Sequence, residues 1–229
     1  MARQVWKPGN MLYPVPAVMV SCQRPGERPN IITIAWAGTI NSDPAMVSIS
    51  VRKERYSHDI IAETGEFVIN LVTKDLVFAT DYCGVKSGAV VDKFKEMQLT
   101  PSVSETVFAP GIAESPVSLE CSVTQCIPLG SHDMFLAEVK AVTVDERYMD
   151  ETGKFDLNST GLISYSHGEY LSLGEKLGQF GYSVRKKAGQ TKKKADRIKG
   201  KDVSNKAGTK ERKNVPNKKQ NGRKKKRIE

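Results

Sequence analysis

The 229-residue sequence lacks the patterns that mark several common classes of protein. No run approaches the roughly 18 apolar residues that a membrane-spanning helix needs. No G-x-G-x-x-G follows an apolar run, as it does in a dinucleotide-binding βαβ unit. Polar residues, Pro and Gly interrupt the opening stretch, so no secretory hydrophobic region is present. We therefore expect a cytoplasmic protein with no membrane-spanning segment.

Cysteine is scarce, and the four residues present form neither a C-x-x-C pair nor a Cys/His zinc spacing. We therefore predict no metal site, and we expect small buried thiols in a reducing compartment. Cys83 lies near other candidate functional residues, but it has no second cysteine close in sequence. No redox role is predicted for it.

Acidic residues are scarce in one region only. Residues 185–229 contain 20 Lys and Arg against 4 Asp and Glu, a net charge of +16, with few apolar residues and no aromatic residue. Such a segment cannot bury enough surface to offset the entropy of ordering, so a disordered basic tail is predicted. It would attract polyanions without sequence preference. Residues 1–184 carry a net charge of −7 and are predicted to form the folded domain.

The first 184 residues contain a series of apolar segments rich in β-branched residues, which predicts strands. These segments cover residues 15–22, 30–38, 45–51, 66–72, 116–127 and 134–145. The turn-forming stretches "QRPGERPN" and "INSDP" separate the first three and indicate antiparallel neighbours. A mainly β fold, a barrel with a few short peripheral helices, is therefore expected.

Two short helices are predicted between these strands. The first covers residues 57–65, with Ser57 as the N-cap and Gly65 as the C-terminal stop. The second covers residues 74–84 and also ends on glycine.

A basic and hydroxyl cluster lies where the third strand meets the first helix. It consists of Arg52, Lys53, Arg55 and Ser57. A helix N-terminus adds unpaired N–H groups and partial positive charge, so this junction suits a phosphate. The alternative is an ordinary strand end that reaches solvent.

Three further signals are weak when each is taken alone. The loop "DYCGVKSGAVVDKF" carries Ser87 and Lys93, and its glycines allow a ligand to approach the backbone closely. His132 stands at the start of a strong strand, where it is either a surface residue or a donor to a carbonyl or phosphate. The stretch 162–183 combines tyrosines with glycines, and it either packs at the edge of the core or closes over a planar ring.

Taken in order, these motifs resemble a known family. The series "N-I-I-T-x-A-W…N-S-x-P…S-x-R-K…S…F-V-I-N-L", "S-G…D-K-F", "G-S-H-x-M-F" and "L-G-E-x-L-G-x-F-G-Y-S" is similar to the flavoredoxin branch of the flavin reductase family. The resemblance covers nearly all of residues 5–184 and excludes the tail. It implies an FMN-binding split β-barrel that forms a homodimer, with each flavin near the subunit interface.

The resemblance also implies roles for individual residues. Asn30, Thr33 and Trp36 are expected beside the isoalloxazine ring and ribityl chain, and Asn41, Ser50 and Arg52 along the ring and its carbonyls. Ser57, Ser87 and Lys93 are expected near the phosphate or ribityl chain, Lys53 extends the basic cluster, and His132 approaches from a neighbouring strand. No catalytic residue is assigned.

Two functional hypotheses follow. The first is an FMN-dependent oxidoreductase that moves electrons between a reduced donor such as NAD(P)H and either flavin or a redox protein. In it, Arg52 or Lys93 would stabilise the anionic reduced flavin. The second is a non-catalytic β-barrel protein tethered to nucleic acid by its basic tail.

Overall fold

The computed structural model describes residues 1–185. A compact unit spans Met1–Glu175, and a second unit begins at Lys176. In the described part of the second unit, a 3-10 helix, η4, covers Tyr182–Val184. The predicted tail lies outside the described residues from residue 186 onward, so its disorder and the boundary near residue 184 stay predictions.

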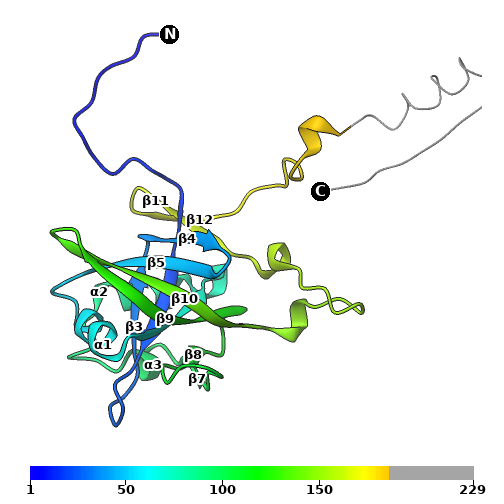
Figure 1. The fold of residues 1–229 in the computed structure, drawn as a ribbon. Helices are drawn as coiled ribbons and strands as arrows, with labels where there is room; N and C mark the ends of the chain where they lie inside the picture. The colour runs from blue at the N-terminus through cyan, green and yellow to red at the C-terminus, as the bar shows by residue number, and fades with distance from the viewer. Residues whose placement is uncertain (186–229) are drawn as a thin grey trace, which may run out of the picture. The chain divides into compact units, whose positions relative to one another are not determined.

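The compact unit is built on one seven-stranded antiparallel sheet that curls into a half-barrel (Figure 1). Its order is β3-β2-β6-β9-β10-β5-β4. The strands are β2 (Val18–Cys22), β3 (Asn30–Ile34), β4 (Ala37–Ser42), β5 (Ala45–Arg52), β6 (Glu66–Leu71), β9 (Val117–Pro128) and β10 (His132–Val144). The long strands β9 and β10, green in Figure 1, join the two halves of the sheet. The predicted mainly β fold is confirmed.

One predicted strand is divided in the structure. The segment predicted at residues 30–38 breaks after Ile34, and a separate strand, β4, then continues to Ser42. The turn that was expected over "INSDP" is therefore shorter, because it occupies only Asp43 and Pro44. The break matters for the site, since it leaves Ala35 and Trp36 between two strands.

Short helices cover one flank of the sheet. They are α1 (Tyr56–Thr64), a 3-10 turn η1 (Lys74–Leu76) that leads into α2 (Val77–Val85), and α3 (Lys93–Glu96). Gly65 ends α1 in the left-handed conformation at φ 68°, as predicted. The predicted N-cap is wrong: Arg55 occupies that position, and Ser57 lies buried in the first turn. The Ser57 hydroxyl accepts a hydrogen bond from Asn30 of β3 and is therefore not used to cap the helix.

Two small sheets complete the unit. One joins β1 (Val15–Pro16), β11 (Ile163–Ser166) and β12 (Glu169–Ser172), and the other joins β7 (Pro101–Ser102) and β8 (Gly111–Ile112). The 3-10 helices η2 (Glu146–Tyr148) and η3 (Leu157–Thr160) lie in the connection from β10 to β11. The β11–β12 hairpin falls in the aromatic and glycine-rich stretch, and its Tyr165 packs at the edge of a core cluster.

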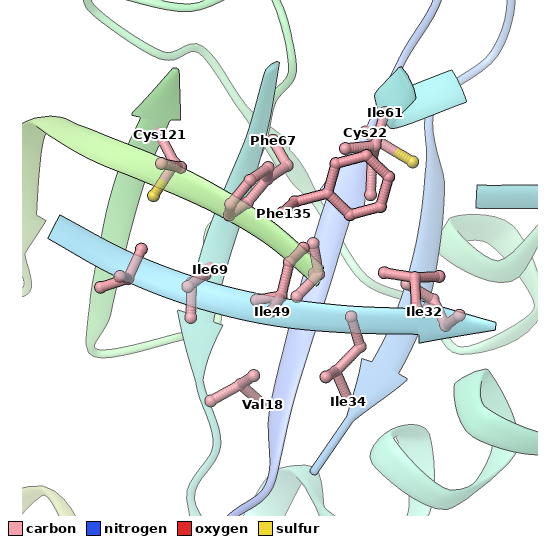
Figure 2. Close-up of a cluster of buried hydrophobic side chains, with 14 of the residues drawn as sticks. Val18, Cys22, Ile32, Ile34, Ile49, Ile61, Phe67, Ile69, Cys121 and Phe135 are labelled. Carbon is pink, nitrogen blue, oxygen red and sulfur yellow. The ribbon is translucent and has the colours of Figure 1, made fainter. Parts of the chain in front are cut away.

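The hydrophobic core lies on both faces of β2 and β3. Inside the half-barrel, side chains from six strands and α1 gather around Phe67 and Phe135 (Figure 2). Met19 and Ile31 face the other way, toward a second cluster that includes residues of α2 and α3. Burial of both faces explains why four of the five residues of β2 are apolar. It also fixes the helices against β3, where the candidate site begins. Within residues 1–185, no helix is long and apolar enough to cross a membrane.

Candidate functional site

A polar cavity of about 310 Å³ lies where β3, the β5–α1 turn and the start of α3 meet. It is called the polar cavity below. Its lining consists of Asn30, Ile32, Glu54, Arg55, Tyr56, Ser57, Cys83, Lys86, Ser87, Gly88 and Lys93.

Three buried polar side chains form part of the lining of this cavity. Asn30, Ser57 and Lys93 are 3%, 1% and 3% exposed, respectively. The Asn30 Nδ2 group donates to Ser57 Oγ at 2.7 Å. Among the described residues, Asn30 Oδ1 is buried without a hydrogen-bond partner. Buried polar atoms are seldom left unpaired, so this oxygen is an acceptor that a hydroxyl of a ligand, unlike a phosphate, would satisfy.

Lys93 supplies a positive charge to the polar cavity. Its Nζ donates to the carbonyl of Ile31 at 2.5 Å and to that of Cys83 at 2.8 Å. An ammonium group has three N–H donors, so one remains for a ligand. Burial, with a smaller contribution from nearby Arg55, lowers the pKa of Lys93 to about 8. An anion in the cavity would offset this cost of burying the charge.

The thiols beside Lys93 do not supply that anion. Burial raises the pKa of Cys83 to about 11 and that of Cys22 to about 12. Both are therefore neutral at pH 7, which leaves the lysine charge without a buried thiolate partner. The high pKa of Cys83 agrees with the expectation that it has no redox role.

Gly88 lines the polar cavity and lies directly against the Asn30 side chain. Its carbonyl accepts a hydrogen bond from Arg28 Nη2 at 2.8 Å, which fixes the loop after α2. A Cβ atom at this position would lie 1.9 Å from Asn30 Oδ1. Only glycine fits here without displacing the Asn30 amide.

Two further cavities adjoin the polar cavity along β3 and β5. The connecting cavity, of about 140 Å³, shares Ile32 and Arg55 with it and also includes Arg52 and His132. The wide cavity, of about 690 Å³, shares four residues with the connecting cavity: Ala35, Trp36, Ser50 and His132. The rest of the wide cavity is lined by Gly9, Asn10, Met11, Leu12, Val15, Ala37, Gly38, Ser48 and Leu129. The three cavities therefore form one run from a cationic end to an apolar end.

Nine of the eleven predicted site residues line this run. The polar cavity contains Asn30, Ser57, Ser87 and Lys93, and the other two contain Thr33, Trp36, Ser50, Arg52 and His132. The Thr33 hydroxyl is already engaged, since it donates to the carbonyl of Thr80.

The other two predicted residues lie elsewhere. Asn41 is exposed on β4, and its amide donates to the carbonyl of Pro44 at 2.8 Å across the β4–β5 turn. Lys53 is not among the residues that line the three cavities, and it forms an ion pair of 3.3 Å with Asp133. β5 ends at Arg52, and Lys53 lies in the turn that follows, where it contacts Asp133 and not the connecting cavity.

Sequence reasoning missed several residues of the run. Arg55, which is shared by the polar and connecting cavities, was noted in the basic cluster but was not assigned to the site. Lys86 and Gly88 lie one residue on either side of the predicted Ser87. No signal pointed to Gly9–Leu12, because that segment shows no periodic pattern and reaches the site only through the fold.

His132 has a defined neighbour. The Ser131 hydroxyl lies 2.9 Å from His132 Nδ1, and His132 pairs in register with Arg52 across β10 and β5. The imidazole and the guanidinium therefore lie side by side at the connecting cavity. Within residues 1–185, no group of His, Cys, Asp or Glu has the arrangement of a metal site.

This geometry fits one kind of ligand. A buried ammonium, a hydroxyl and an amide suit a phosphate group, and the apolar cavity with Trp36 suits a planar ring. Donors from Arg52 and His132 stand between the two ends. A phosphorylated flavin has this combination of parts.

Comparisons with known proteins agree. A family model described as "Flavin reductase like domain" matches residues 10–173. An uncharacterized protein of Archaeoglobus fulgidus is 32% identical over 143 residues, which is 62% of this chain and 80% of that protein.

Solved structures show the same relationship. Flavoredoxin of Desulfovibrio vulgaris is 31% identical with a TM-score of 0.74, and the match covers 80% of this chain and all of that one. Flavoredoxin from Methanosarcina acetivorans is 28% identical with a TM-score of 0.72 and the same coverage. The chain belongs to the flavin reductase family, in its flavoredoxin-like branch, and has the split-barrel fold.

Proposed function

We propose that this protein is an FMN-dependent oxidoreductase that moves electrons between a reduced donor such as NAD(P)H and a flavin or protein acceptor. The observation that carries the proposal is the buried trio Asn30, Ser57 and Lys93 at one end of a run of cavities whose other end is mainly apolar. The family supports a flavoprotein; the donor, the acceptor and the choice of FMN are proposed.

FMN is favoured over FAD by the size of the polar cavity. About 310 Å³, partly closed by the Lys86–Gly88 loop, suits one phosphate and part of a ribityl chain. The second phosphate and the adenosine of FAD would have to leave past Arg55 and Lys86 into solvent. A single terminal phosphate uses the buried donors fully.

Each end of the run would contribute separately when FMN is bound. FMN supplies the hydride and electron chemistry. Lys93 and Ser57 would hold the phosphate and fix the position of the cofactor. Trp36 and its apolar neighbours would exclude water from one face of the ring, while Arg52 and His132 offer hydrogen-bond donors at its polar edge.

The wide cavity supports enzyme activity over simple electron carriage. Its volume of about 690 Å³ is in the range of sites that enclose a drug-sized ligand, so a flavin ring and part of a second planar molecule would fit. The matching test is anaerobic stopped-flow reduction of the bound flavin. Rapid bleaching by NADH or NADPH is expected, and a holoprotein that neither nucleotide reduces would be a carrier.

We further propose a homodimer that resides in the cytoplasm. Val5, Trp6, Met11 and Leu12 expose large apolar side chains along the N-terminal segment, which is the kind of surface that a second subunit covers. Light scattering on a size-exclusion column would give the mass, with twice 25.3 kDa expected.

The basic tail is proposed to contact polyanions without sequence preference. The body has a net charge of −7, so retention on heparin would come from residues 185–229. Truncation after Lys187 should abolish that retention and leave FMN content unchanged. Loss of flavin on truncation would instead favour a tail that completes the site.

A further inference from the structure

His58 lies beside the site and touches none of the three cavities. It follows Ser57 in the first turn of α1, but the two side chains have different neighbours. Ser57 lines the polar cavity, whereas His58 contacts Asp133 of β10. One turn of helix therefore contacts both the proposed phosphate end and the strand that carries His132.

The contacts of His58 use both ring nitrogens. Nδ1 lies 2.9 Å from Asp59 Oδ1, and Nε2 lies 2.9 Å from Asp133 Oδ2. The His58 and Asp133 side chains are each 12% exposed. The ring also packs edge-on against Phe135, with 5.6 Å between centroids. The Lys53 ammonium lies 3.3 Å from Asp133 Oδ1, an ion-pair contact without hydrogen-bond alignment.

The register of the sheet connects this contact to the other end of the site. Asp133 follows His132 at the start of β10, where His132 pairs with Arg52 and Asp133 pairs with Val51. Successive side chains on a strand point to opposite faces, so His132 lines the cavities while Asp133 points to α1. Fixing Asp133 to His58 therefore fixes the strand end that presents His132.

We propose that His58 and Asp133 are positioning residues that hold the phosphate end and the ring end of the flavin site in a fixed relation. The proposal rests on the proposed function, because it describes how that same site is assembled. Neither side chain touches the cavities, so their effect on a ligand passes through Ser57 on α1 and His132 on β10.

The protonation state of His58 governs this contact. Two carboxylates face the ring, so an imidazolium can donate to both, whereas a neutral imidazole can donate to only one. The other groups near the pair are Lys53, which contacts Asp133, and the Cys126 thiol of β9, whose pKa is raised by burial and which is therefore neutral. Apart from Lys53 and His58 itself, no cation among the described residues contacts the carboxylate of Asp59 or of Asp133.

The pKa values of His58 and Asp133 are both shifted by this contact. Burial acts to lower the pKa of His58, but the hydrogen bonds to Asp59 and Asp133 outweigh it, and the pKa is raised above 6.5. The hydrogen bond to His58 lowers the pKa of Asp133. A raised histidine pKa means that the contact is complete below about pH 6.5 and is lost as the pH rises through the folded-state value.

Two variants and a matched control test the proposal. Asp133→Asn and His58→Gln remove the charged pair, while Glu63→Gln removes the exposed Arg24–Glu63 ion pair, in which Arg24 Nη2 lies 2.9 Å from Glu63 Oε1 on the last turn of the same helix. The FMN dissociation constant is measured by fluorescence between pH 6 and pH 8.5. Titration of the FMN phosphate and of Lys93 affects wild type and variants equally. At each pH, the dissociation constant of the variant is therefore divided by that of wild type, and only this ratio is compared.

Both pair variants should bind FMN about tenfold more weakly than wild type at pH 6, equivalent to one hydrogen bond to a charged group. The ratio should fall toward one as the pH rises through the folded-state pKa of wild-type His58, which is raised above 6.5. Glu63→Gln should match wild type at every pH. Ratios of one throughout for the pair variants, with FMN bound, would overturn the positioning role and leave the proposed function intact.

A second measurement needs neither a variant nor flavin. The sequence contains three histidines, so their ring signals can be followed separately by NMR during a pH titration. Each histidine has its own titration curve, and the curve of His132 should show a second inflection at the pH where His58 titrates, because Asp133 links the two. His167, which packs against Tyr13 at 4.7 Å in the β11–β12 turn, serves as the control and should not follow. If the titration curve of His132 responds to His58 no more than that of His167 does, the proposed coupling does not exist.

Discussion

The polar cavity and the wide cavity differ in how deeply their lining residues are buried. At the polar cavity, the lining residues Asn30, Ser57 and Lys93 are buried and hydrogen-bonded. The wide cavity is walled on one side by Gly9–Leu12, all of them exposed. A rigid end suits a group that stays bound, and an exposed end suits molecules that come and go. The comparison predicts that changes at the polar cavity cost cofactor affinity and that similar changes at the wide cavity do not.

The largest effect is expected from Gly88→Ala. The added Cβ would meet Asn30 Oδ1 at 1.9 Å, so either the loop or the amide must move and the buried donors lose their geometry. FMN affinity should fall by at least about 100-fold, a loss of about 2.7 kcal/mol. Isothermal titration calorimetry would measure it.

The matched control for that change is Gly38→Ala in the wide cavity. Within residues 1–185, nothing lies within 4 Å of a Cβ at Gly38. Its FMN affinity should stay within about twofold of wild type, or about 0.4 kcal/mol. Equal losses in the two variants would erase the distinction between the two ends.

Lys93→Ala should weaken FMN binding by about 10- to 100-fold, the loss of one charge-assisted hydrogen bond of about 1.5–3 kcal/mol. Lys95→Ala, an exposed lysine on the same short helix, provides the control and should bind as wild type does. Fluorescence titration at moderate salt would show the difference. Unchanged affinity in Lys93→Ala would mean that the phosphate lies elsewhere.

The pH dependence of binding should also separate the two ends. The pKa of Lys93 is lowered to about 8 by burial, so its charge is lost as the pH rises above that value in the flavin-free protein. A bound phosphate favours the ammonium, so binding takes up a proton and FMN affinity should fall about fivefold from pH 8 to pH 9. Riboflavin, which has no phosphate, is the control, and a parallel fall in its affinity would argue against Lys93 as the cause.

Cys83→Ser should have the smallest effect. The Cys83 carbonyl, and not its thiol, accepts from Lys93, and this carbonyl survives the substitution. Stopped-flow flavin reduction should stay within about threefold of wild type. A drop of more than about 100-fold, near 2.7 kcal/mol of barrier, would require a catalytic thiol despite its raised pKa.

The sequence predicted the parts of this molecule that depend on local pattern. The strands follow from alternation and β-branched residues, and the end of α1 follows from Gly65. Three residues of the basic cluster, Arg52, Arg55 and Ser57, line the cavities, while their role in binding a phosphate stays a prediction.

The sequence could not predict what depends on distant partners. Ser57 has the features of an N-cap, and only the fold brings Asn30 close enough to take its hydroxyl. His58 and Asp133 are 75 residues apart, so no spacing rule could pair them. Lys53 and Arg52 are equivalent in the sequence pattern. In the structure, Arg52 lines the connecting cavity, whereas Lys53 pairs with Asp133.

The central claim is that the buried cationic end holds the single phosphate of FMN. The most direct test is to release the cofactor from the purified full-length protein by heating and to identify it by chromatography, with the amount measured against protein. The account predicts FMN, close to one per chain. Recovery of mainly FAD, or a colourless protein that does not take up added FMN, would contradict it.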